Sequence, residues 1–436
     1  MLTIEYLCII KMKILILSKE AWRDEQNGGN VLSNIFSSFK DSEFAQVYCT
    51  DAEPNNSICK KYFQFTDKMM VDSFLHWKKA GTFRLYKDFP ISTSKTVESY
   101  QTFKRFGEMI RVAREVVWKL GRWDIEGLLN FVTDFNPNVI FAPCYGSHYM
   151  IRITKLVKEH LKKPIISYIS DDFYSNNQLF FNPIIWINHQ LLRKNVRSVF
   201  RIYDLVYTMT EEQKVQCERE FHANMKILCK NGIFSPVNEK KKVNSPIRLV
   251  YGGGIYINRW KTLLALTNAI KIINCNGRKL FLDIYTNTYL DKSILEQLND
   301  GVNVNLYPSV SMNELRQIYK ESDIALHCEA FDKKSRKIVQ LSFSTKIVDC
   351  LDSGCAVMAI CSPEQAGFAY LRRNDAAICI DEIGKILPVL ESIISNPEIL
   401  ITYQKKTFEL GRKNHLEKNI TAMLKDDFIQ VILKSK

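Results

Sequence analysis

Short apolar runs alternate with stretches of helical periodicity throughout the first half of the chain. The runs of strand length are 13–18, 44–50, 137–141, 164–169, 204–208 and 225–229. Between them, apolar residues recur with the spacing of one helix face, over 31–39, 149–161 and 211–221. Strands that alternate with helices form a parallel sheet covered by helices on both faces. The pattern therefore predicts a doubly wound α/β domain over residues 1–235.

The same alternation resumes after a polar, basic segment that contains Glu239 followed by three lysines. We interpret residues 236–246 as a linker. The later strands are predicted over 247–252, 280–285, 302–306, 323–327, 356–361 and 377–380, with helices over 260–273, 311–320, 345–351, 383–395 and 417–433. We expect a second Rossmann-like domain over 247–415, followed by a terminal segment over 416–436. In paired sheets of this kind, ligands bind beyond the carboxyl ends of the strands.

Size and composition support two domains in a reduced compartment. A chain of 436 residues exceeds one core, and two domains of roughly 200 residues are expected. No apolar run reaches about 18 residues, so no membrane span is predicted. The apolar start lacks the pattern of a signal peptide, and Met12 directly precedes a strand pattern, which leaves open whether residues 1–11 are native. The twelve cysteines occur singly without zinc spacing, so we expect reduced thiols, no metal and a cytoplasmic protein.

The net charge of +13 favours an anionic partner, such as a nucleoside diphosphate, nucleic acid or anionic lipid. The surplus concentrates over 76–122, where eleven lysines and arginines stand against four acids, with aromatic residues between them. This mixture suits the headgroup zone of an anionic membrane. A helical insert whose lysine side chains extend into solvent explains the same composition equally well. No nucleic-acid recognition motif is present, so we expect no nucleic-acid partner.

Gly28, Gly29 and Asn30 follow the first predicted strand. Paired glycines allow the backbone to approach a phosphate closely at a helix start. A plain turn that caps the next helix explains the same residues equally well. These positions are candidates for binding a diphosphate.

A second glycine loop, with Gly253 and Gly254, follows the strand over 247–252, and Arg259 and Lys261 stand at the start of the next helix. Glycines followed by cations suit a diphosphate. A flexible loop with solvated cations is the alternative. The glycines do not have the Gly-x-Gly-x-x-Gly spacing of a dinucleotide-binding fingerprint. No acid stands at the end of the second strand of this half either.

The segment Ser344, Thr345, Lys346 and Asp349 spans another predicted helix start. A helix N-terminus offers unpaired N–H groups and partial positive charge. Hydroxyl and ammonium donors add charge-assisted contacts of about 1.5–3 kcal/mol each. Asp349 lies on the same helix face as Lys346 and is suited to accept from both ribose hydroxyls. An ordinary amphipathic helix with a serine N-cap is the alternative.

Asp171 and Asp172 follow the strand over 164–169. A carboxylate at this place is suited to act as a general base or to orient an acceptor hydroxyl, and capping the next helix is the structural alternative. His148, near the end of an earlier strand, is a weaker catalytic candidate, with a structural role as its alternative.

Taken together, these loops resemble the GT-B superfamily of glycosyltransferases, and in particular family 4 and related bacterial surface-polysaccharide transferases. The likeness is strongest over 248–371, where the glycine turn with Asn258-Arg259-Trp260-Lys261 resembles the donor domain. The runs 327–332 and 343–346 look like the donor loop. Asp349 matches the second acid of the family's Glu-(seven residues)-Glu motif, whereas the first acid would fall at Leu341, so Glu329 or Ser344 is expected to share its duty.

The resemblance implies a metal-independent hexosyltransferase that needs no cofactor and moves a sugar from a nucleoside diphosphate sugar to a glycan or lipid-linked acceptor in surface-polysaccharide synthesis. It further implies that Arg259 and Lys346 grip the diphosphate, that Gly28 and Gly29 face it, and that the terminal helix packs back on the first domain. A sugar-nucleotide epimerase, a phosphorylase and a non-catalytic assembly subunit remain alternatives. The donor sugar, the base, the acceptor, the stereochemical outcome and the oligomeric state stay open.

Overall fold

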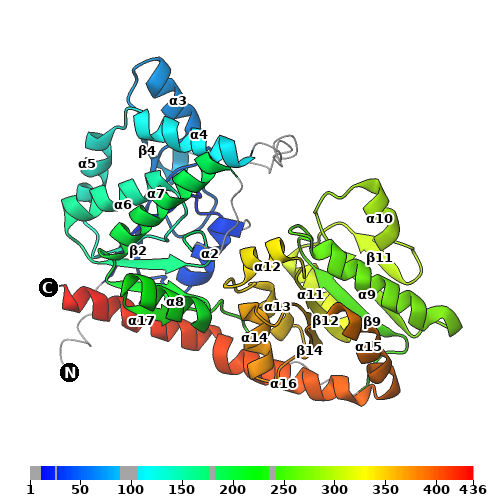
Figure 1. Cartoon of the computed structure of the whole chain (residues 1–436). Helices are drawn as coiled ribbons and strands as arrows, with labels where there is room; N and C mark the ends of the chain where they lie inside the picture. The colour runs from blue at the N-terminus through cyan, green and yellow to red at the C-terminus, as the bar shows by residue number, and fades with distance from the viewer. Residues whose placement is uncertain (1–10, 25–26, 89–106, 176–181, 235–241, 436) are drawn as a thin grey trace, which may run out of the picture.

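The computed structural model describes residues 11–24, 27–88, 107–175, 182–234 and 242–435. The chain forms two lobes, each built on one β-sheet with helices on its faces (Figure 1). This arrangement confirms the predicted pair of doubly wound α/β units.

The N-terminal lobe contains an eight-stranded sheet in the order β4-β3-β2-β1-β5-β6-β7-β8. Its strands are β1 (Lys13–Leu17), β2 (Glu43–Tyr48), β3 (Lys61–Gln64), β4 (Thr82–Leu85), β5 (Val139–Phe141), β6 (Ile165–Ile169), β7 (Leu205–Thr208) and β8 (Met225–Ile227). All neighbours pair in parallel except β3 and β4, which pair antiparallel. The basic region over 76–122 therefore is not a wholly helical insert, because β4 belongs to the sheet.

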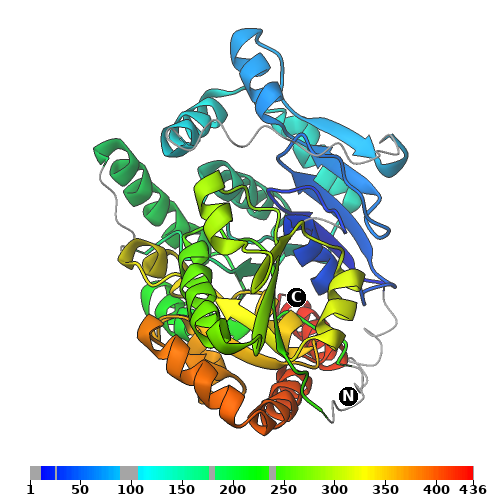
Figure 2. The same cartoon turned by 90° about the vertical axis from the view of Figure 1, so that its right-hand side faces the viewer.

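Helices cover both faces of this sheet because successive strand residues point to opposite sides. The helices are α2 (Asn27–Phe36), α3 (Asp67–Leu75), α4 (Gly107–Leu120), α5 (Ile125–Phe135), α6 (His148–Leu161), α7 (Pro183–Phe200) and α8 (Glu211–Phe221), with a 3₁₀ turn η1 (Tyr86–Asp88). In β1, Ile14 and Ile16 pack in the core that includes α2, whereas Leu15 and Leu17 pack in the core that includes α5 and α6. The far end, with α3 and β4, projects away from the other lobe (Figures 1 and 2).

The C-terminal lobe contains a six-stranded, all-parallel sheet in the order β11-β10-β9-β12-β13-β14. Its strands are β9 (Ile247–Gly252), β10 (Leu280–Tyr285), β11 (Val304–Tyr307), β12 (Ile324–Cys328), β13 (Ala356–Ile360) and β14 (Ile378–Ile380). Its helices are α9 (Arg259–Ile273), α10 (Lys292–Leu298), α11 (Met312–Glu321), α12 (Lys333–Val339), α13 (Lys346–Leu351), α14 (Ala366–Arg373) and α15 (Ile386–Ser395), with 3₁₀ turns η2 (Asn274–Asn276) and η3 (Ile383–Lys385). β13 is wholly buried, as expected for a central parallel strand.

Two consecutive helices, α16 (Glu398–His415) and α17 (Glu417–Lys434), carry the chain back from the second lobe to the first (Figure 1). α17 inserts Ile420, Leu424 and Phe428 into the core of the N-terminal lobe. This return crossing is bonded to the forward one, since Gly232 N–H donates to the His415 carbonyl (2.8 Å) and Glu417 N–H donates to the Gly232 carbonyl (3.0 Å). The two lobes therefore share one hydrogen-bonded junction.

Candidate functional site

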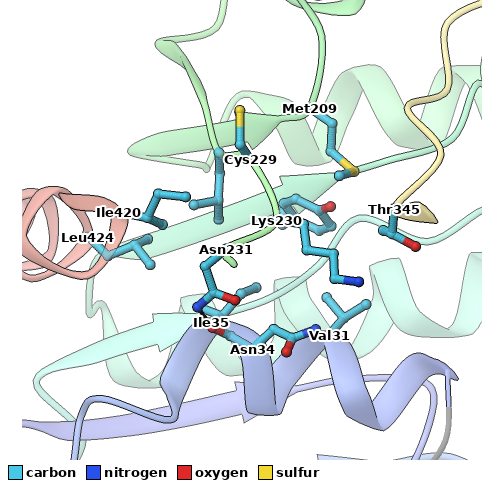
Figure 3. A pocket seen from close by; sticks show the side chains of 12 residues that line it. Val31, Asn34, Ile35, Met209, Cys229, Lys230, Asn231, Thr345, Ile420 and Leu424 are labelled. Atoms are coloured by element: carbon cyan, nitrogen blue, oxygen red, sulfur yellow. Dashed lines mark hydrogen bonds between the residues drawn. The ribbon is translucent and has the colours of Figure 1, made fainter. Parts of the chain in front are cut away.

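The carboxyl ends of N-terminal strands face the loop before α13 of the other lobe. Thr210, just beyond β7, donates through Oγ1 to the Leu341 carbonyl (3.0 Å), and Ser342 Oγ lies 3.3 Å from Asp171 Oδ1, beyond β6. A small cavity of about 40 Å³ lies between the lobes (Figure 3). It is lined by Val31, Asn34, Ile35, Tyr168, Met209, Leu228, Cys229, Lys230, Asn231, Thr345, Ile420 and Leu424. The site suggested by the sequence is thus an interface between lobes.

Lys346, the first residue of α13, turns toward the glycine loop after β9. Its Nζ lies 3.2 Å from the Tyr251 hydroxyl and 3.4 Å from the Gly254 carbonyl oxygen, and 5.0 Å from the centre of the Tyr251 ring. Burial, reinforced by the Arg259 guanidinium, lowers the pKa of Lys346 to about 8. The ammonium therefore remains mostly protonated at neutral pH, but it is poorly solvated and would gain from an anionic partner.

Gly253 makes this approach possible. Its φ is +136°, a conformation that suits glycine, and a Cβ at this position would lie 2.3 Å from Lys346 Nζ. The glycine loop and Lys346, distant in sequence, are therefore fitted to one another.

Arg259 and Glu329 form a buried bidentate pair beside Lys346. Arg259 Nε donates to Glu329 Oε2 (2.7 Å) and its NH2 nitrogen donates to Oε1 (2.9 Å). Arg259 is 8% exposed and Glu329 2% exposed. Two of the guanidinium nitrogens are thus committed to a carboxylate of the protein, and a diphosphate would meet Arg259 already held in place by Glu329.

His327, on β12, is buried next to these cations. Its Nε2 atom has no hydrogen-bond partner among the described residues. Burial, together with the charges of Arg259 and Lys346, lowers the pKa of His327 to about 3. The imidazole is therefore neutral, and it adds no further positive charge to the site.

Asp349 lies one turn into α13, as the sequence predicted, but it is not open to solvent on all sides. Lys230 of the N-terminal lobe pairs with it, with Nζ 2.6 Å from Asp349 Oδ1. The local sequence of Lys230, between Cys229 and Asn231, carries no signal for such a role. Sequence reasoning therefore missed it, because the contact depends on how the lobes dock.

The other donor candidates are placed as follows. Thr345 lines the cavity and is exposed, Ser344 is partly buried, and Lys261 is exposed beside the Trp260 ring. α13 begins at Lys346, one residue later than predicted, and Thr345 is its N-cap without a side-chain capping bond. Gly28, Gly29 and Asn30 fall in the first turn of α2, which begins at Asn27, rather than in a loop before a helix at residue 31.

The two acids named for the family motif stand on different elements. Glu329 follows β12 directly, α12 comes next, and Asp349 lies on α13. Leu341 is buried, and its carbonyl serves the contact with Thr210 described above. Glu329 and Asp349 are thus separated by α12.

Asp171 and Asp172, the adjacent catalytic candidates of the N-terminal lobe, have different surroundings. Asp172 is buried and accepts from the backbone N–H of Ser175 (3.0 Å) and from the Ser175 hydroxyl, which stabilises the local turn. Burial raises its pKa. Asp171 is exposed and faces Ser342 of the other lobe. Of the adjacent pair, only Asp171 points toward the interface.

His148 begins α6 and is held by two amides. Its Nδ1 accepts from Asn195 Nδ2 (2.8 Å) and its Nε2 lies 3.2 Å from Asn188 Oδ1. Burial lowers the pKa of His148, so the ring is neutral. It lines a cavity of about 390 Å³ between α4, α6 and α7.

Glu115, on α4, lines the same cavity and was missed by the sequence analysis. It accepts from the His148 backbone N–H (3.2 Å), and its Oε2 is buried without a hydrogen-bond partner among the described residues. Burial raises its pKa. A second hollow, lined by Lys19, Arg111, Gly146 and Phe173 among others, shares Glu115 with the first and opens at the carboxyl ends of β1, β5 and β6. The two hollows together form a groove in the N-terminal lobe, lined by α4, α6, α7 and the carboxyl ends of these strands.

No group of three or more His, Cys, Asp or Glu side chains with the geometry of a metal site occurs among the described residues. None of the helices described is long and apolar enough to cross a bilayer.

At the level of sequence, no family model and no curated protein matches the chain. Solved structures do match. HepE of Anabaena, in complex with UDP, is 11% identical, with a TM-score of 0.63 over 96% of this chain and 100% of that chain. Sucrose-phosphate synthase of Thermosynechococcus elongatus is 10% identical, with a TM-score of 0.62 over 97% and 100%.

These neighbours are GT-B glycosyltransferases, and the structural correspondence extends over 96–97% of this chain. The chain has the GT-B fold. A third neighbour, α,α-trehalose 6-phosphate synthase of Burkholderia multivorans, agrees at 10% identity and a TM-score of 0.59, over 98% of each chain. The GT-B resemblance is confirmed for the fold, whereas the roles given to single residues stay predictions.

Proposed function

We propose that this chain is a glycosyltransferase that moves a sugar from a nucleoside diphosphate sugar to an acceptor held by the N-terminal lobe. The observation that carries the proposal is the corner formed by Lys346, Arg259 and the glycine loop, which faces the interface between the lobes. Asp349 lies one turn from Lys346 on the same short helix, at the spacing suited to a ribose.

The chemistry of the corner fits the departure of a nucleoside diphosphate. Negative charge develops on the diphosphate as the sugar–phosphate bond breaks, and fixed cations stabilise that charge without reorganising. Lys346 is poorly solvated and oriented by Tyr251, and Arg259 is fixed by Glu329. We propose that these two cations supply the stabilisation, so that neither a metal nor a cofactor takes part.

Uridine diphosphate is the first nucleotide to test. HepE was solved with UDP, with UDP-glucose, and with UDP together with glucose. HepE is distant from this chain in sequence. The base and the sugar of the donor are therefore to be determined by binding measurements on this protein.

The test is a thermal-shift screen against UDP, GDP, ADP and CDP. A ligand that binds only the folded protein raises its melting temperature by mass action. We expect one nucleotide to raise it by several degrees in the wild type and in Lys292→Ala, a control on an exposed lysine of the same lobe. Lys346→Ala should retain its fold but lose the shift. Equal shifts in all three proteins would refute the donor site.

For the acceptor, we propose a lipid-linked glycan of a surface polysaccharide, met at the inner face of an anionic membrane. α4 and α7, which flank the groove, expose apolar side chains: Met109, Ile110, Val116, Leu120, Ile184, Trp186, Ile187 and Leu191. Arg111 and Lys119 lie exposed among them. Apolar side chains surrounded by cations are typical of helices that rest in a headgroup layer.

The aromatic residues of 76–122 do not all serve this surface. Trp118 is fully buried in the core, as is most of Trp123 just beyond the region, whereas Trp77 and Phe83 are exposed. Deleting the whole region would therefore remove part of the core and of the sheet. Point substitutions give a cleaner test.

Flotation with phosphatidylglycerol vesicles separates the outcomes. Trp186→Ser with Ile187→Ser should reduce flotation, whereas Ile272→Ser with Val302→Ser, at similarly exposed apolar positions of the other lobe, should not. Equal flotation of the two double variants, or none by the wild type, would refute membrane contact through α7. Neither result bears on the donor site.

A further inference from the structure

The position expected to hold the nucleotide ribose is already engaged by the opposite lobe. Lys230 Nζ lies 2.6 Å from Asp349 Oδ1, and the two side chains are only 18% and 21% exposed. The pair joins residues 119 positions apart, one beyond β8 of the N-terminal lobe and one on α13 of the C-terminal lobe. It is therefore an ion pair that connects the two lobes within the candidate site.

The backbone that carries Lys230 is fixed on its own side. The Lys230 carbonyl accepts from His415 Nδ1 (3.0 Å), at the junction of the two chain crossings. Asn231, the next residue, donates through Nδ2 to the Asn34 carbonyl on α2 (2.9 Å). The Lys230 carbonyl and the Asn231 side chain thus each contact another element, while the Lys230 side chain extends into the cavity near Thr345 (Figure 3).

The ribose and Lys230 would draw on the same atom. A carboxylate that binds a vicinal diol accepts one hydroxyl on each oxygen. Oδ1 of Asp349 already accepts from the ammonium at close range, in a partly buried setting where a second set of donors would crowd it. A ribose that binds Asp349 would therefore compete with Lys230 for Oδ1.

We propose that Lys230 is a positioning residue of the donor site, which holds Asp349 and the two lobes together before the donor arrives and is displaced by the ribose hydroxyls. The inference rests on the proposed function. It follows that the ion pair lowers the affinity for any nucleotide with both ribose hydroxyls, and leaves unchanged the affinity for a nucleotide that lacks them.

The experiment measures binding by calorimetry for two ligands and three proteins. The ligands are the nucleoside diphosphate that most stabilises the wild type in the thermal-shift screen and its 2′,3′-dideoxy analogue. The proteins are wild type, Lys230→Met and Arg373→Met. Arg373 pairs with Glu212 across the same two lobes, but away from Asp349, so its loss controls for a looser interface.

Lys230→Met should bind the ribonucleotide about fivefold more tightly, the size expected for removing a competing ion pair that is partly exposed. Its affinity for the dideoxy analogue should equal that of the wild type. Arg373→Met should match the wild type with both ligands. The measured sign is decisive, because an ammonium that itself gripped the nucleotide would give weaker binding when removed.

Weaker or unchanged ribonucleotide binding by Lys230→Met would overturn the inference, as would an equal gain with both ligands. In each case the donor site would stand. Should the wild type bind no nucleoside diphosphate, the proposed function would fall, and the inference with it.

Discussion

The two sides of the interface between the lobes differ in how their charged side chains are held. On the C-terminal side, Arg259, Glu329 and Lys346 are enclosed and fixed to one another or to the glycine loop. On the N-terminal side, Asp171 is exposed, and a cavity of about 390 Å³ lies between α4, α6 and α7. A rigid cationic corner suits a small ligand of constant charge, whereas an open groove suits a larger acceptor. The difference teaches that the C-terminal corner is organised in advance, as the proposed donor site requires, and that the N-terminal side is not.

The largest expected effect is on the buried pair. Arg259→Ala leaves Glu329 buried without its partner, so the free energy of unfolding should fall by about 3–5 kcal/mol. Urea denaturation measures it. Arg248→Ala, which breaks an exposed pair with Glu321 in the same lobe, should cost only about 0–1 kcal/mol. If the two variants lose equal stability, the C-terminal corner is no more rigid than its surface, and the comparison fails.

The next effect concerns the fit between the glycine loop and Lys346. Gly253→Ala places a methyl group against Lys346 Nζ at a positive φ, and should cost about 1–3 kcal/mol. Gly277→Ala is the matched control, because its φ is also positive (+106°) but nothing lies within 4 Å of the new Cβ. Both variants carry backbone strain, and only Gly253→Ala should lose nucleotide binding in the thermal-shift assay. Retained binding would mean that Lys346 has room to move.

A smaller and graded effect follows from the lowered pKa of Lys346. The group has to be protonated to bind a diphosphate, and its pKa in the free protein is about 8. Affinity should therefore be nearly constant below pH 8 and fall by about tenfold per pH unit above it, until the bound-state pKa is reached. Calorimetry from pH 6.5 to 9.5 tests this. Lys346→Arg should give a flat profile at weaker affinity, and a flat wild-type profile would contradict the assignment.

The smallest effects are expected on the acceptor side. Asp172→Asn weakens the acceptor for Ser175 and should lower the free energy of unfolding by about 1 kcal/mol. Asp171→Asn, at an exposed position, should change it by less than about 0.5 kcal/mol. Thermal unfolding compares the two. A larger loss for Asp171→Asn would show that the N-terminal side is as rigidly organised as the other, which would remove the contrast.

The sequence predicted the C-terminal sheet well, because its strands are largely apolar, and β12 and β13 are buried on both faces. The predicted bounds of β9 and β10 agree with the structure at both ends. β3 and β4 were missed because each has four residues and lies near the sheet edge, without a continuous apolar run. α16 was missed because its exposed face is rich in lysine and arginine, which hides the apolar spacing.

The candidate site, too, was predicted from the sequence only in part. The sequence predicted that Gly253 and Lys346 serve one site, since both follow strand ends of one sheet, and the structure brings them into contact. It did not predict that Arg259 is held by Glu329, nor that Asp349 is held by Lys230. The second of these depends on how two domains dock, and local sequence carries little information about that geometry.

The return of α17 to the first lobe has a consequence for how the protein forms on the ribosome. Ile420, Leu424 and Phe428 complete a core whose strands begin at residue 13. The N-terminal lobe therefore emerges early but reaches its final packing only when α17 has been synthesised. Until then an apolar face beside α2 stays uncovered, which makes the nascent first half a natural client for chaperones.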